Sequence, residues 1–284
     1  MSKNILCLKG ISKAFGGVHA LDNVDLCVKE GQIHCLMGEN GSGKSTLIKV
    51  ISGVYQPDSG EIMLNGNLYH KLNPAESVRQ GVQIIYQDFS VFPNLTVAEN
   101  IIFGQTVAEK QKLTHNKKKR QNAAKIAQEI GLKADLSEIV ENLSVAEKQM
   151  VAICRALLND AKLLIFDEPT TALTQKEVKN LFALIHKMQK KGVSTLFVSH
   201  KLEEVFEIAE EFTILRNGKK VITTDAASIT REKFIFYMTG RQLSEKQFVM
   251  NVCKTGDPLL EVRDLSMEGF YKNVNFSLYP GEIL

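Results

Sequence analysis

Short runs of mostly apolar residues recur along the chain, and each predicts a buried β-strand. The clearest runs are Ile33–Met37, Leu163–Phe166 and Thr195–Val198. Helical patterns accompany them over residues 175–191 and 201–209. Continuous apolar strands that alternate with helices are typical of a buried, largely parallel sheet. The pattern therefore predicts an α/β core.

Antiparallel pairing is expected in other parts of the chain. Residues 61–70 read as a β-hairpin, because Asn65-Gly66 supplies the positive φ angles that a tight turn requires. A second turn of this kind, Asn217-Gly218, joins two further strand patterns. Residues 4–36 read as short strands separated by turns. These segments predict an antiparallel β portion beside the parallel core.

Helices are expected to interrupt the strands over residues 88–160. Capping boxes, in which Ser or Thr is followed three residues later by Glu, mark helix starts at Thr96, Ser144 and Thr174. The first two fall within residues 88–160, which we interpret as an α-helical insertion. A further helix is expected at Thr230–Met238.

The end of the chain repeats its beginning. Asn273–Ile283 follows the pattern of Asn23–Ile33, and Leu260–Ser266 mirrors Leu6–Ser12. Internal repeats indicate repeated structural units. We therefore expect a complete domain over residues 1–240, a linker over 241–258, and the start of a second, incomplete domain over 259–284. On this interpretation, the chain is a truncated or split form of a protein near twice its length.

Composition narrows the class of protein. Of 284 residues, 35 are basic and 32 acidic, and 44% are hydrophobic, as in an ordinary globular protein. The near balance of charge argues against a nucleic-acid coat. The basic run Lys117–Arg120 is interpreted as a solvated helix face, because no aromatic residues interleave with it. No nucleic acid is expected as a partner.

Membrane spans, secretion and disulfides are also not expected. No apolar run approaches the roughly 18 residues that a membrane span requires, and the first residues lack the pattern of a secretion signal. The cysteines are odd in number and form no C-x-x-C pair, which suits reduced thiols in an intracellular protein. They are Cys7, Cys27, Cys35, Cys154 and Cys253.

A glycine-rich segment after one predicted strand carries the strongest chemical signal. Residues 38–45 fit the phosphate-loop pattern G-x-x-x-x-G-K-S, between a predicted strand and a predicted helix. Backbone N–H groups of such a loop face an anion, the lysine reaches terminal phosphates, and the serine hydroxyl can coordinate Mg²⁺. The predicted ATP-contacting residues here are Gly38, Glu39, Asn40, Gly41, Ser42, Gly43, Lys44, Ser45 and Thr46.

Two carboxylates follow the apolar run Leu163–Phe166. A parallel strand delivers its C-terminal residues to the crevice in which ligands bind. Asp167 is therefore predicted to hold Mg²⁺ together with Ser45, and Glu168 to accept a proton from an attacking water molecule.

These two motifs stand in a fixed order with three polar residues, Gln87, Ser144 and His200. Over residues 1–240 the chain resembles the nucleotide-binding subunit of an ABC transporter, a P-loop NTPase cassette. Thr174 stands where most relatives have aspartate. The chain is similar to the double-cassette ATPases of bacterial monosaccharide importers. This similarity rests on Thr174, residues 199–204, residues 238–241 and the shortened second copy. These are the ribose, galactose and xylose kind, and autoinducer-type sugar importers are a close variant.

The resemblance implies roles for four residues. Phe15 would stack on adenine, and Gln87 would contact Mg²⁺ or water and signal to the permease. His200 would contact the γ-phosphate and position water with Glu168. Ser144 would reach the ATP of an opposite cassette.

The signature segment departs from the family pattern. Relatives carry L-S-G-G-Q, whereas this chain has Leu143-Ser144-Val145-Ala146-Glu147. Val145 and Ala146 hinder the close backbone approach that glycine allows. We expect weaker closure of one composite site rather than loss of ATP binding.

The resemblance implies an ATPase, with ATP and Mg²⁺, that powers sugar import from the cytoplasmic face of the inner membrane. Its partners would be membrane permease subunits, a sugar-binding protein indirectly, and a second cassette from a self-dimer or a missing C-terminal half. The alternative is a soluble tandem-cassette ATPase acting on ribosomes or nucleic acid. A small-molecule kinase is disfavoured, since it would not need Gln87, Ser144 and His200.

Overall fold

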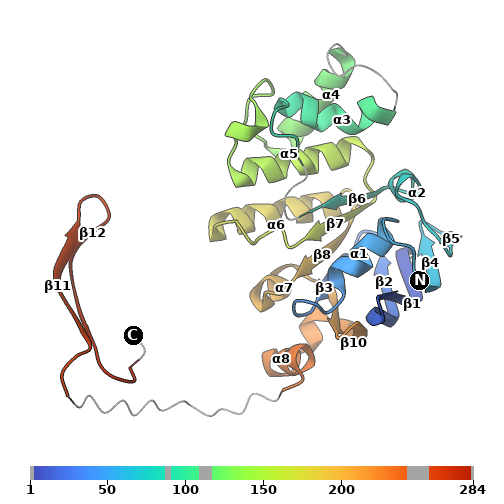
Figure 1. Cartoon of the computed structure of the whole chain (residues 1–284). Coiled ribbons are helices and arrows are strands. Elements are labelled where there is room, and N and C mark those ends of the chain that lie inside the picture. The colour runs from blue at the N-terminus through green and yellow to red at the C-terminus, as the bar shows by residue number, and fades with distance from the viewer. Residues whose placement is uncertain (1–2, 87–90, 109–116, 242–255, 283–284) are drawn as a thin grey trace. The chain divides into compact units, whose positions relative to one another are not determined.

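The computed structural model describes residues 3–86, 91–108, 117–241 and 256–282. It contains two compact units, Met1–Gln242 and Leu243–Leu284, which are described separately (Figure 1). In the described part of the chain, no helix is both long enough and apolar enough to cross a membrane.

A six-stranded sheet forms the centre of the first unit, in the order β10-β9-β3-β8-β7-β6. Every neighbouring pair is parallel except β9 with β10, which is antiparallel. The predicted parallel core is therefore confirmed. Its strands are β3 Ile33–Met37, β6 Val82–Ile85, β7 Leu163–Asp167, β8 Ser194–Ser199, β9 Glu211–Arg216 and β10 Lys219–Asp225.

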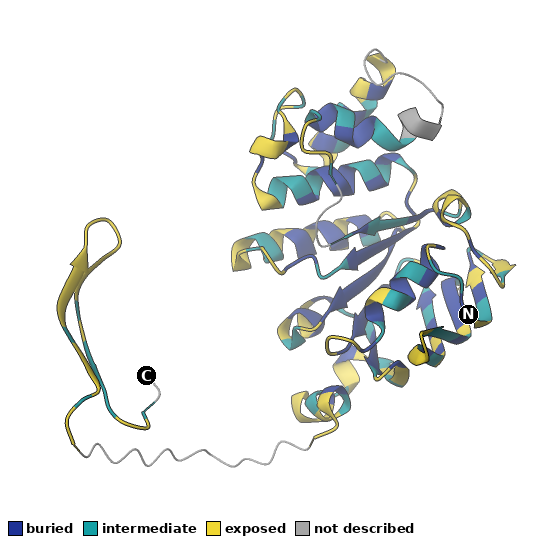
Figure 2. Ribbon diagram, viewed as in Figure 1, coloured by how far each residue is buried: buried dark blue, intermediate teal, exposed yellow. Residues whose placement is uncertain are grey.

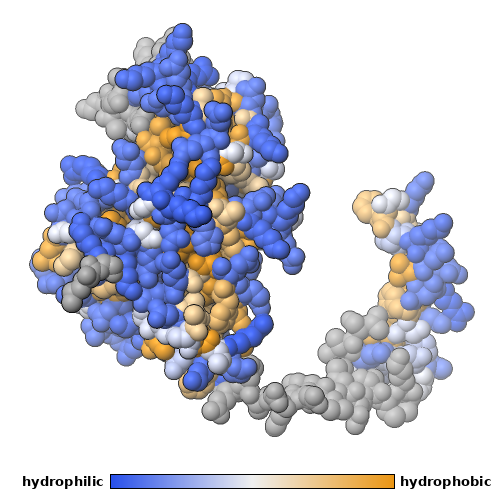
Figure 3. All heavy atoms as spheres, turned by 180° about the vertical axis from the view of Figure 1, so that it is seen from behind, coloured by the Kyte–Doolittle hydropathy of each residue, from blue (hydrophilic) through white to orange (hydrophobic). Residues whose placement is uncertain are grey.

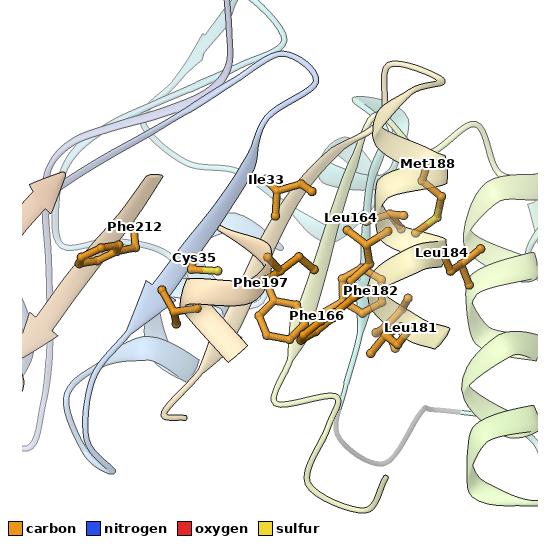
Figure 4. Packing of buried hydrophobic residues seen from close by; sticks show 14 of the residues in the cluster. Ile33, Cys35, Leu164, Phe166, Leu181, Phe182, Leu184, Met188, Phe197 and Phe212 are labelled. Carbon is orange, nitrogen blue, oxygen red and sulfur yellow. The ribbon is translucent and has the colours of Figure 1, made fainter. Parts of the chain in front are cut away.

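Helices cover this sheet, and the strands between them are buried (Figure 2). Figure 4 shows Phe166 and Phe197 of the sheet beside Phe182 of α6. The ring centroids of Phe182 and Phe197 are 5.7 Å apart in an edge-to-face arrangement. The helices of this part are α1 Lys44–Ile51, α2 Pro74–Arg79, α6 Gln175–Gln189, α7 Leu202–Ile208 and α8 Arg231–Thr239, with a short 3₁₀ turn at Ala226–Ser228.

An antiparallel sheet of order β2-β1-β4-β5 completes the first unit's β structure. Its strands are β1 Asn4–Phe15, β2 Val18–Lys29, β4 Ser59–Leu64 and β5 Asn67–Tyr69. The first two are longer than the predicted short strands, because shifts in register let them continue through Gly10 and Asn23, both at positive φ. Both predicted hairpin turns, at Asn65-Gly66 and Asn217-Gly218, are confirmed.

The predicted helical insertion contains α3 Val97–Ala108, α4 Lys117–Ile130 and α5 Val145–Leu158, with a 3₁₀ turn at Val140–Asn142. Its helices share a buried apolar cluster that includes Ile101, Ala123 and Val151. All three predicted capping boxes form. In α6, for example, the Thr174 N–H donates to Glu177 Oε2 at 2.8 Å. Local sequence chemistry thus sets where these helices begin.

Apolar residues also gather at the surface of the first unit. Figure 3 shows them on the face opposite the view of Figure 1, in a band bordered by hydrophilic residues.

The second unit is a hairpin of β11 Leu260–Met267 and β12 Tyr271–Leu278 that reproduces the pairing of β1 with β2. In the first copy, the Asn23 N–H donates to Ser12 Oγ at 3.0 Å, and in the second, the Asn273 N–H donates to Ser266 Oγ at 2.8 Å. Both asparagines have positive φ, 54° and 55°. The repeat therefore extends to side-chain hydrogen bonds.

The expectation of reduced thiols throughout is wrong. Cys7 and Cys27 are directly opposite each other on β1 and β2, with Cα atoms 4.1 Å apart, and form a disulfide. Cross-strand register brings them together, whereas their spacing in sequence carries no such information. Cys35 and Cys154 are buried as thiols, and Cys253 lies outside the described residues.

Candidate functional site

The glycine-rich loop connects the end of β3 to the start of α1 in a shape that requires glycine. A Cβ atom on Gly38 would collide with the Ser42 side chain and the Leu215 carbonyl oxygen. Gly43 has φ 105°, and a Cβ atom there would meet the Ala20 carbonyl oxygen at 2.6 Å. Such φ values are available mainly to glycine. The loop therefore wraps tightly in front of the helix N-terminus.

Lys44 follows the loop as the first residue of α1, and only 6% of its surface is exposed. Its ammonium donates to the carbonyl oxygens of Gly38 at 2.7 Å and Glu39 at 3.1 Å. Burial lowers the pKa of Lys44, and the nearby carboxylates of Glu168 and Asp167 oppose that change. A buried cation held by backbone oxygens is suited to receive an anion.

Two observations indicate polar groups that an anion could use at the same place. Ser42 Oγ is buried, and it neither donates nor accepts a hydrogen bond within the described part of the chain. Gly43 caps α1 without any side-chain hydrogen bond to the first turn. The first N–H groups of a helix lack intrahelical partners and favour anions such as phosphate.

Two acidic residues lie at the end of β7, as predicted. Glu168 has φ 49°, a left-handed conformation that is uncommon for a residue with a side chain. Its N–H donates to the Val198 carbonyl oxygen at 3.0 Å. Its carboxylate lies 3.2 Å from His200 Nδ1 and 3.9 Å from Lys44 Nζ. Glu168, His200 and Lys44 therefore form one group.

Asp167 is a partly buried carboxylate. Burial raises its pKa, and the neighbouring charge of Glu168 adds to the effect, while Lys44 opposes it. A carboxylate of this kind is stabilised by a cation. Carboxylate and hydroxyl oxygens are suitable ligands for Mg²⁺, which takes one or two carboxylates together with phosphate and water. Asp167, together with Ser45 on the first turn of α1, fits this donor chemistry. No larger cluster of metal-binding side chains occurs among the described residues.

The remaining predicted loop residues lie at the edge of this group. Glu39 and Asn40 are exposed, and with His200 they line a hollow of about 370 Å³ against α8. Gly41 and Ser45 are exposed as well, and Thr46 is partly buried. The hollow therefore begins beside the phosphate loop.

Phe15 ends β1 with 42% of its surface exposed. Its ring meets the Tyr55 ring edge to face, with 5.1 Å between centroids, and Lys13 Nζ lies 5.5 Å from the ring centroid. The exposed part of the ring is available to a planar group. Gln87 lies outside the described residues.

Ser144 lies in a different hollow, of about 650 Å³, that none of the phosphate-loop residues line. It caps α5, where its hydroxyl donates to Glu147 Oε2 at 2.8 Å and accepts from the Glu147 N–H at 3.3 Å. Within this chain, Ser144 is therefore not gathered with Lys44, Glu168 and His200.

Sequence reasoning missed a buried carboxylate next to this site. Glu204 receives hydrogen bonds from Thr170, which follows the acidic pair, and from Ser199, which precedes His200. In the sequence, residues 199–204 contribute only to the resemblance to a family. No signal in the sequence identifies Glu204, because the pairing with Thr170 depends on how distant segments fold together.

Comparisons with known proteins place the chain in a family. Residues 21–171 match the family model described as ABC transporter. The chain is 39% identical over 280 residues to the ribose import ATP-binding protein RbsA of Caldanaerobacter subterraneus subsp. tengcongensis, an alignment that covers 99% of this chain and 56% of that protein. It is 42% identical over 281 residues to the protein of the same name in Clostridium perfringens, with coverage of 99% and 56%. The chain thus spans about half the length of these curated relatives.

Solved structures show the same fold. An ATP-binding cassette of an ABC transporter, MJ1267 in its ADP conformation, superposes with a TM-score of 0.73 at 27% identity, covering 79% of this chain and 92% of that one. The cassette MJ0796, solved as a dimer bound to ADP and Pi, has a TM-score of 0.68 at 26% identity, covering 79% and 100%. Together with the family match and the arrangement of Lys44, Glu168 and His200, these likenesses show that the chain belongs to the ABC transporter family, as an ATP-binding cassette.

Proposed function

We propose that this chain binds and hydrolyses ATP to power the import of a sugar through a separate membrane permease. One observation carries the proposal: Lys44 of the phosphate loop, Glu168 and His200 lie in a single group, with 3.9 Å and 3.2 Å between their charged or polar atoms. A P-loop ATPase requires a phosphate-binding lysine and a residue that orients or deprotonates water.

The proposed roles follow from these positions. The loop from Gly38 to Thr46 holds the phosphates of ATP, and Lys44 exchanges its contacts with loop carbonyl oxygens for phosphate oxygens. The exposed ring of Phe15 stacks on adenine. Ser45 and Asp167 would hold Mg²⁺, with Gln87 as a further proposed ligand, and the bound ion would supply positive charge against the phosphates.

Catalysis is assigned to the residues at the ends of β7 and β8. Glu168 accepts a proton from the attacking water molecule, and His200 lies within hydrogen-bond range of that carboxylate. A positioned general base contributes roughly 10²–10⁴ in rate. Gln87 is proposed to report the state of the site to the permease.

A second cassette is proposed to complete the site. The relative MJ0796 was solved as a dimer with ADP and Pi. In the same arrangement, Ser144 at the start of α5 would face ATP bound by another cassette, either a second copy of this chain or a C-terminal half. Glu147 already receives hydrogen bonds from Ser144, so we expect the contact with phosphate to be weakened.

The repeated hairpin supports a proposal for the domains. We assign residues 1–240 to one cassette, with its helical insertion over 88–160, and 241–258 to a linker. Residues 259–284 are assigned to the opening strands of a second cassette, because β11 and β12 repeat the register and hydrogen bonds of β1 and β2.

The substrate class rests on relatives named as ribose import ATP-binding proteins. The proposed location is the cytoplasmic face of the inner membrane, bound to permease subunits and served indirectly by a sugar-binding protein. Neither nucleic acid nor the ribosome is proposed as a partner, since no observation favours them.

Affinity purification of the tagged chain from its native cells tests the proposal. Recovery of a membrane permease, together with ATPase activity that rises when the permease and sugar-bound binding protein are reconstituted, is the expected result. Recovery of ribosomes without a permease would support the alternative instead.

A further inference from the structure

A buried carboxylate joins the two segments that carry Glu168 and His200. Glu204 lies on the first turn of α7 and is only 6% exposed. Its Oε1 accepts a hydrogen bond from Thr170 Oγ1 at 2.6 Å, and its Oε2 accepts one from Ser199 Oγ at 2.6 Å. Hydroxyl–carboxylate bonds of this length belong to the strong, charge-assisted class.

On one side, this carboxylate fixes the backbone around His200. Ser199 precedes His200, and its hydroxyl donates to Glu204 while accepting the N–H of Lys201 at 3.0 Å. The Lys201 ammonium lies 3.2 Å from Glu204 Oε1 and donates to the Thr170 carbonyl oxygen at 3.3 Å. Both chain neighbours of His200 are therefore tied to Glu204.

On the other side, the same carboxylate fixes the backbone that follows Glu168. Thr170 is two residues after Glu168 and is 2% exposed. Thr171 Oγ1 donates to the Glu168 carbonyl oxygen at 3.1 Å, and Gln149 of α5 donates to the Pro169 carbonyl oxygen at 3.3 Å. Hydrogen bonds from α5 and to Glu204 therefore hold the turn that follows Glu168.

The exposure of the two catalytic candidates shows why such a support matters. The His200 side chain is 44% exposed and that of Glu168 is 19% exposed. Because packing does not fully enclose the two side chains, their separation depends on how the backbone beside them is held. Glu168 also has the left-handed φ of 49°, which costs energy unless its surroundings enforce it. The Glu204 cluster supplies hydrogen bonds directly beside both residues.

We propose that Glu204 is a positioning residue that sets the contact between His200 Nδ1 and Glu168 through Ser199 and Thr170. It touches neither ATP nor the reacting atoms. The inference rests on the proposed ATP hydrolysis and extends it by naming the group that aligns the base and the histidine. The role of Glu204 requires the hydroxyl groups of Thr170 and Ser199, and it does not depend on the size of those side chains.

A pair of variants separates the hydroxyl from the bulk of the side chain. Thr170→Val removes the hydroxyl at nearly constant volume, whereas Thr170→Ser keeps it. We expect Thr170→Val and Glu204→Gln to lower kcat by about tenfold to a hundredfold, because small misplacements of reacting groups have effects of that size. Thr170→Ser should keep most of the parent rate. The dissociation constant of ATP should be unchanged in all three, because the phosphate loop is intact.

Glu203→Gln is the matched control on the same helix. The Glu203 side chain is 71% exposed and forms an ion pair at the surface with Arg231, at 2.7 Å. Thermal melting of each variant shows which proteins are folded at the assay temperature. The ring signal of His200, followed by NMR without nucleotide, should move or broaden in Thr170→Val and stay in place in Thr170→Ser.

Two results would overturn the proposal. One is parent-like kcat in both Thr170→Val and Glu204→Gln. The other is an unchanged His200 ring signal in a folded Thr170→Val variant. If the parent chain itself fails to hydrolyse ATP, the proposed function fails, and the NMR comparison still decides whether Glu204 positions His200.

Discussion

His200 Nδ1 lies 3.2 Å from Glu168 Oε2, because the two residues follow the C-terminal ends of neighbouring parallel strands. β7 and β8 pair in register, with Asp167 opposite Val198. Each candidate is therefore delivered to the same edge of the sheet, where ligands of open α/β sheets bind. His200 contacts Oε2 of Glu168, whereas Lys44 lies nearest its other oxygen, Oε1.

Replacing Glu168 by Gln should stop ATP turnover while leaving ATP bound. The amide cannot accept the proton of water, and loss of a general base lowers the rate by roughly 10²–10⁴. Lys44 should keep its contacts, because the amide fills the same space. Single-turnover hydrolysis and equilibrium dialysis with labelled ATP measure the two effects separately. Hydrolysis close to the parent rate would refute the assignment of Glu168 as the base.

Replacing Lys44 by Ala should abolish detectable ATP binding. The change removes the buried ammonium that lies between the loop carbonyl oxygens and Glu168. A hydrogen bond to a charged group contributes about 1.5–3 kcal/mol, and the phosphates would lose several. Dialysis against ATP measures the loss, and Lys9→Ala, at an exposed position on β1, is the control. Unchanged binding in Lys44→Ala would show that this loop is not the ATP site.

The elements that the sequence predicts well are those whose cause is local. The Gly38–Ser45 loop, the Asn65-Gly66 turn and the capping boxes each depend on residues within a few positions of one another. The end of β7 was predicted for a similar reason, since a continuous apolar run ends in two carboxylates. The parallel direction of the core strands is predicted by their alternation with helices, whereas their order in the sheet is not.

Features that depend on distant segments were not predictable from the sequence. The Cys7–Cys27 disulfide depends on the register of β1 against β2, which includes several shifts. Glu204 accepts hydrogen bonds from Thr170 and Ser199, which lie outside its helix. The residues around Glu204 in the sequence do not indicate these contacts. Ser144 was predicted as both a helix cap and a phosphate contact. The structure shows its hydroxyl used by the cap.

The stability of the fold should fall in acid partly because of Glu211. The neighbouring polar ring of buried His34, whose Nδ1 lies 3.3 Å from Glu211 Oε2, and the Gln32 amide, which donates to the same oxygen at 3.1 Å, together lower the pKa of Glu211 from 4.5 to about 2. Because the folded-state pKa is depressed, the ionised carboxylate stabilises the fold above pH 4.5, and this stabilisation is lost as the pH falls toward about 2.

Glu211→Gln should therefore melt at a lower temperature than the parent at neutral pH, with a loss of about 1–3 kcal/mol. The difference in melting temperature between the parent and Glu211→Gln should narrow as the pH falls from 4.5 to about 2, because the parent carboxylate becomes neutral over that range. Thermal melts followed by circular dichroism at each pH measure it. A gap that stays constant down to the lowest pH would contradict the role of the charge.

Glu147→Gln should strengthen ATP-dependent pairing of cassettes. The Glu147 carboxylate accepts the Ser144 N–H at 3.0 Å and the Ser144 hydroxyl at 2.8 Å, so a negative charge already sits at the N-terminus of α5. An approaching phosphate would be repelled there. Glutamine can keep the cap through its oxygen, but it removes the charge.

Two like charges about 4 Å apart in water repel each other by about 1 kcal/mol. Removing the Glu147 charge should therefore raise the association constant of two ATP-bound cassettes by roughly fivefold. The protein concentration at which ATPase activity is half-maximal should therefore fall by that factor. The matched control is Glu99→Gln, because Glu99 accepts the same two hydrogen bonds from Thr96 at the start of α3, at 2.9 Å and 2.8 Å. An equal effect in both variants, or none in Glu147→Gln, would show that the N-terminus of α5 does not face the phosphate of another cassette.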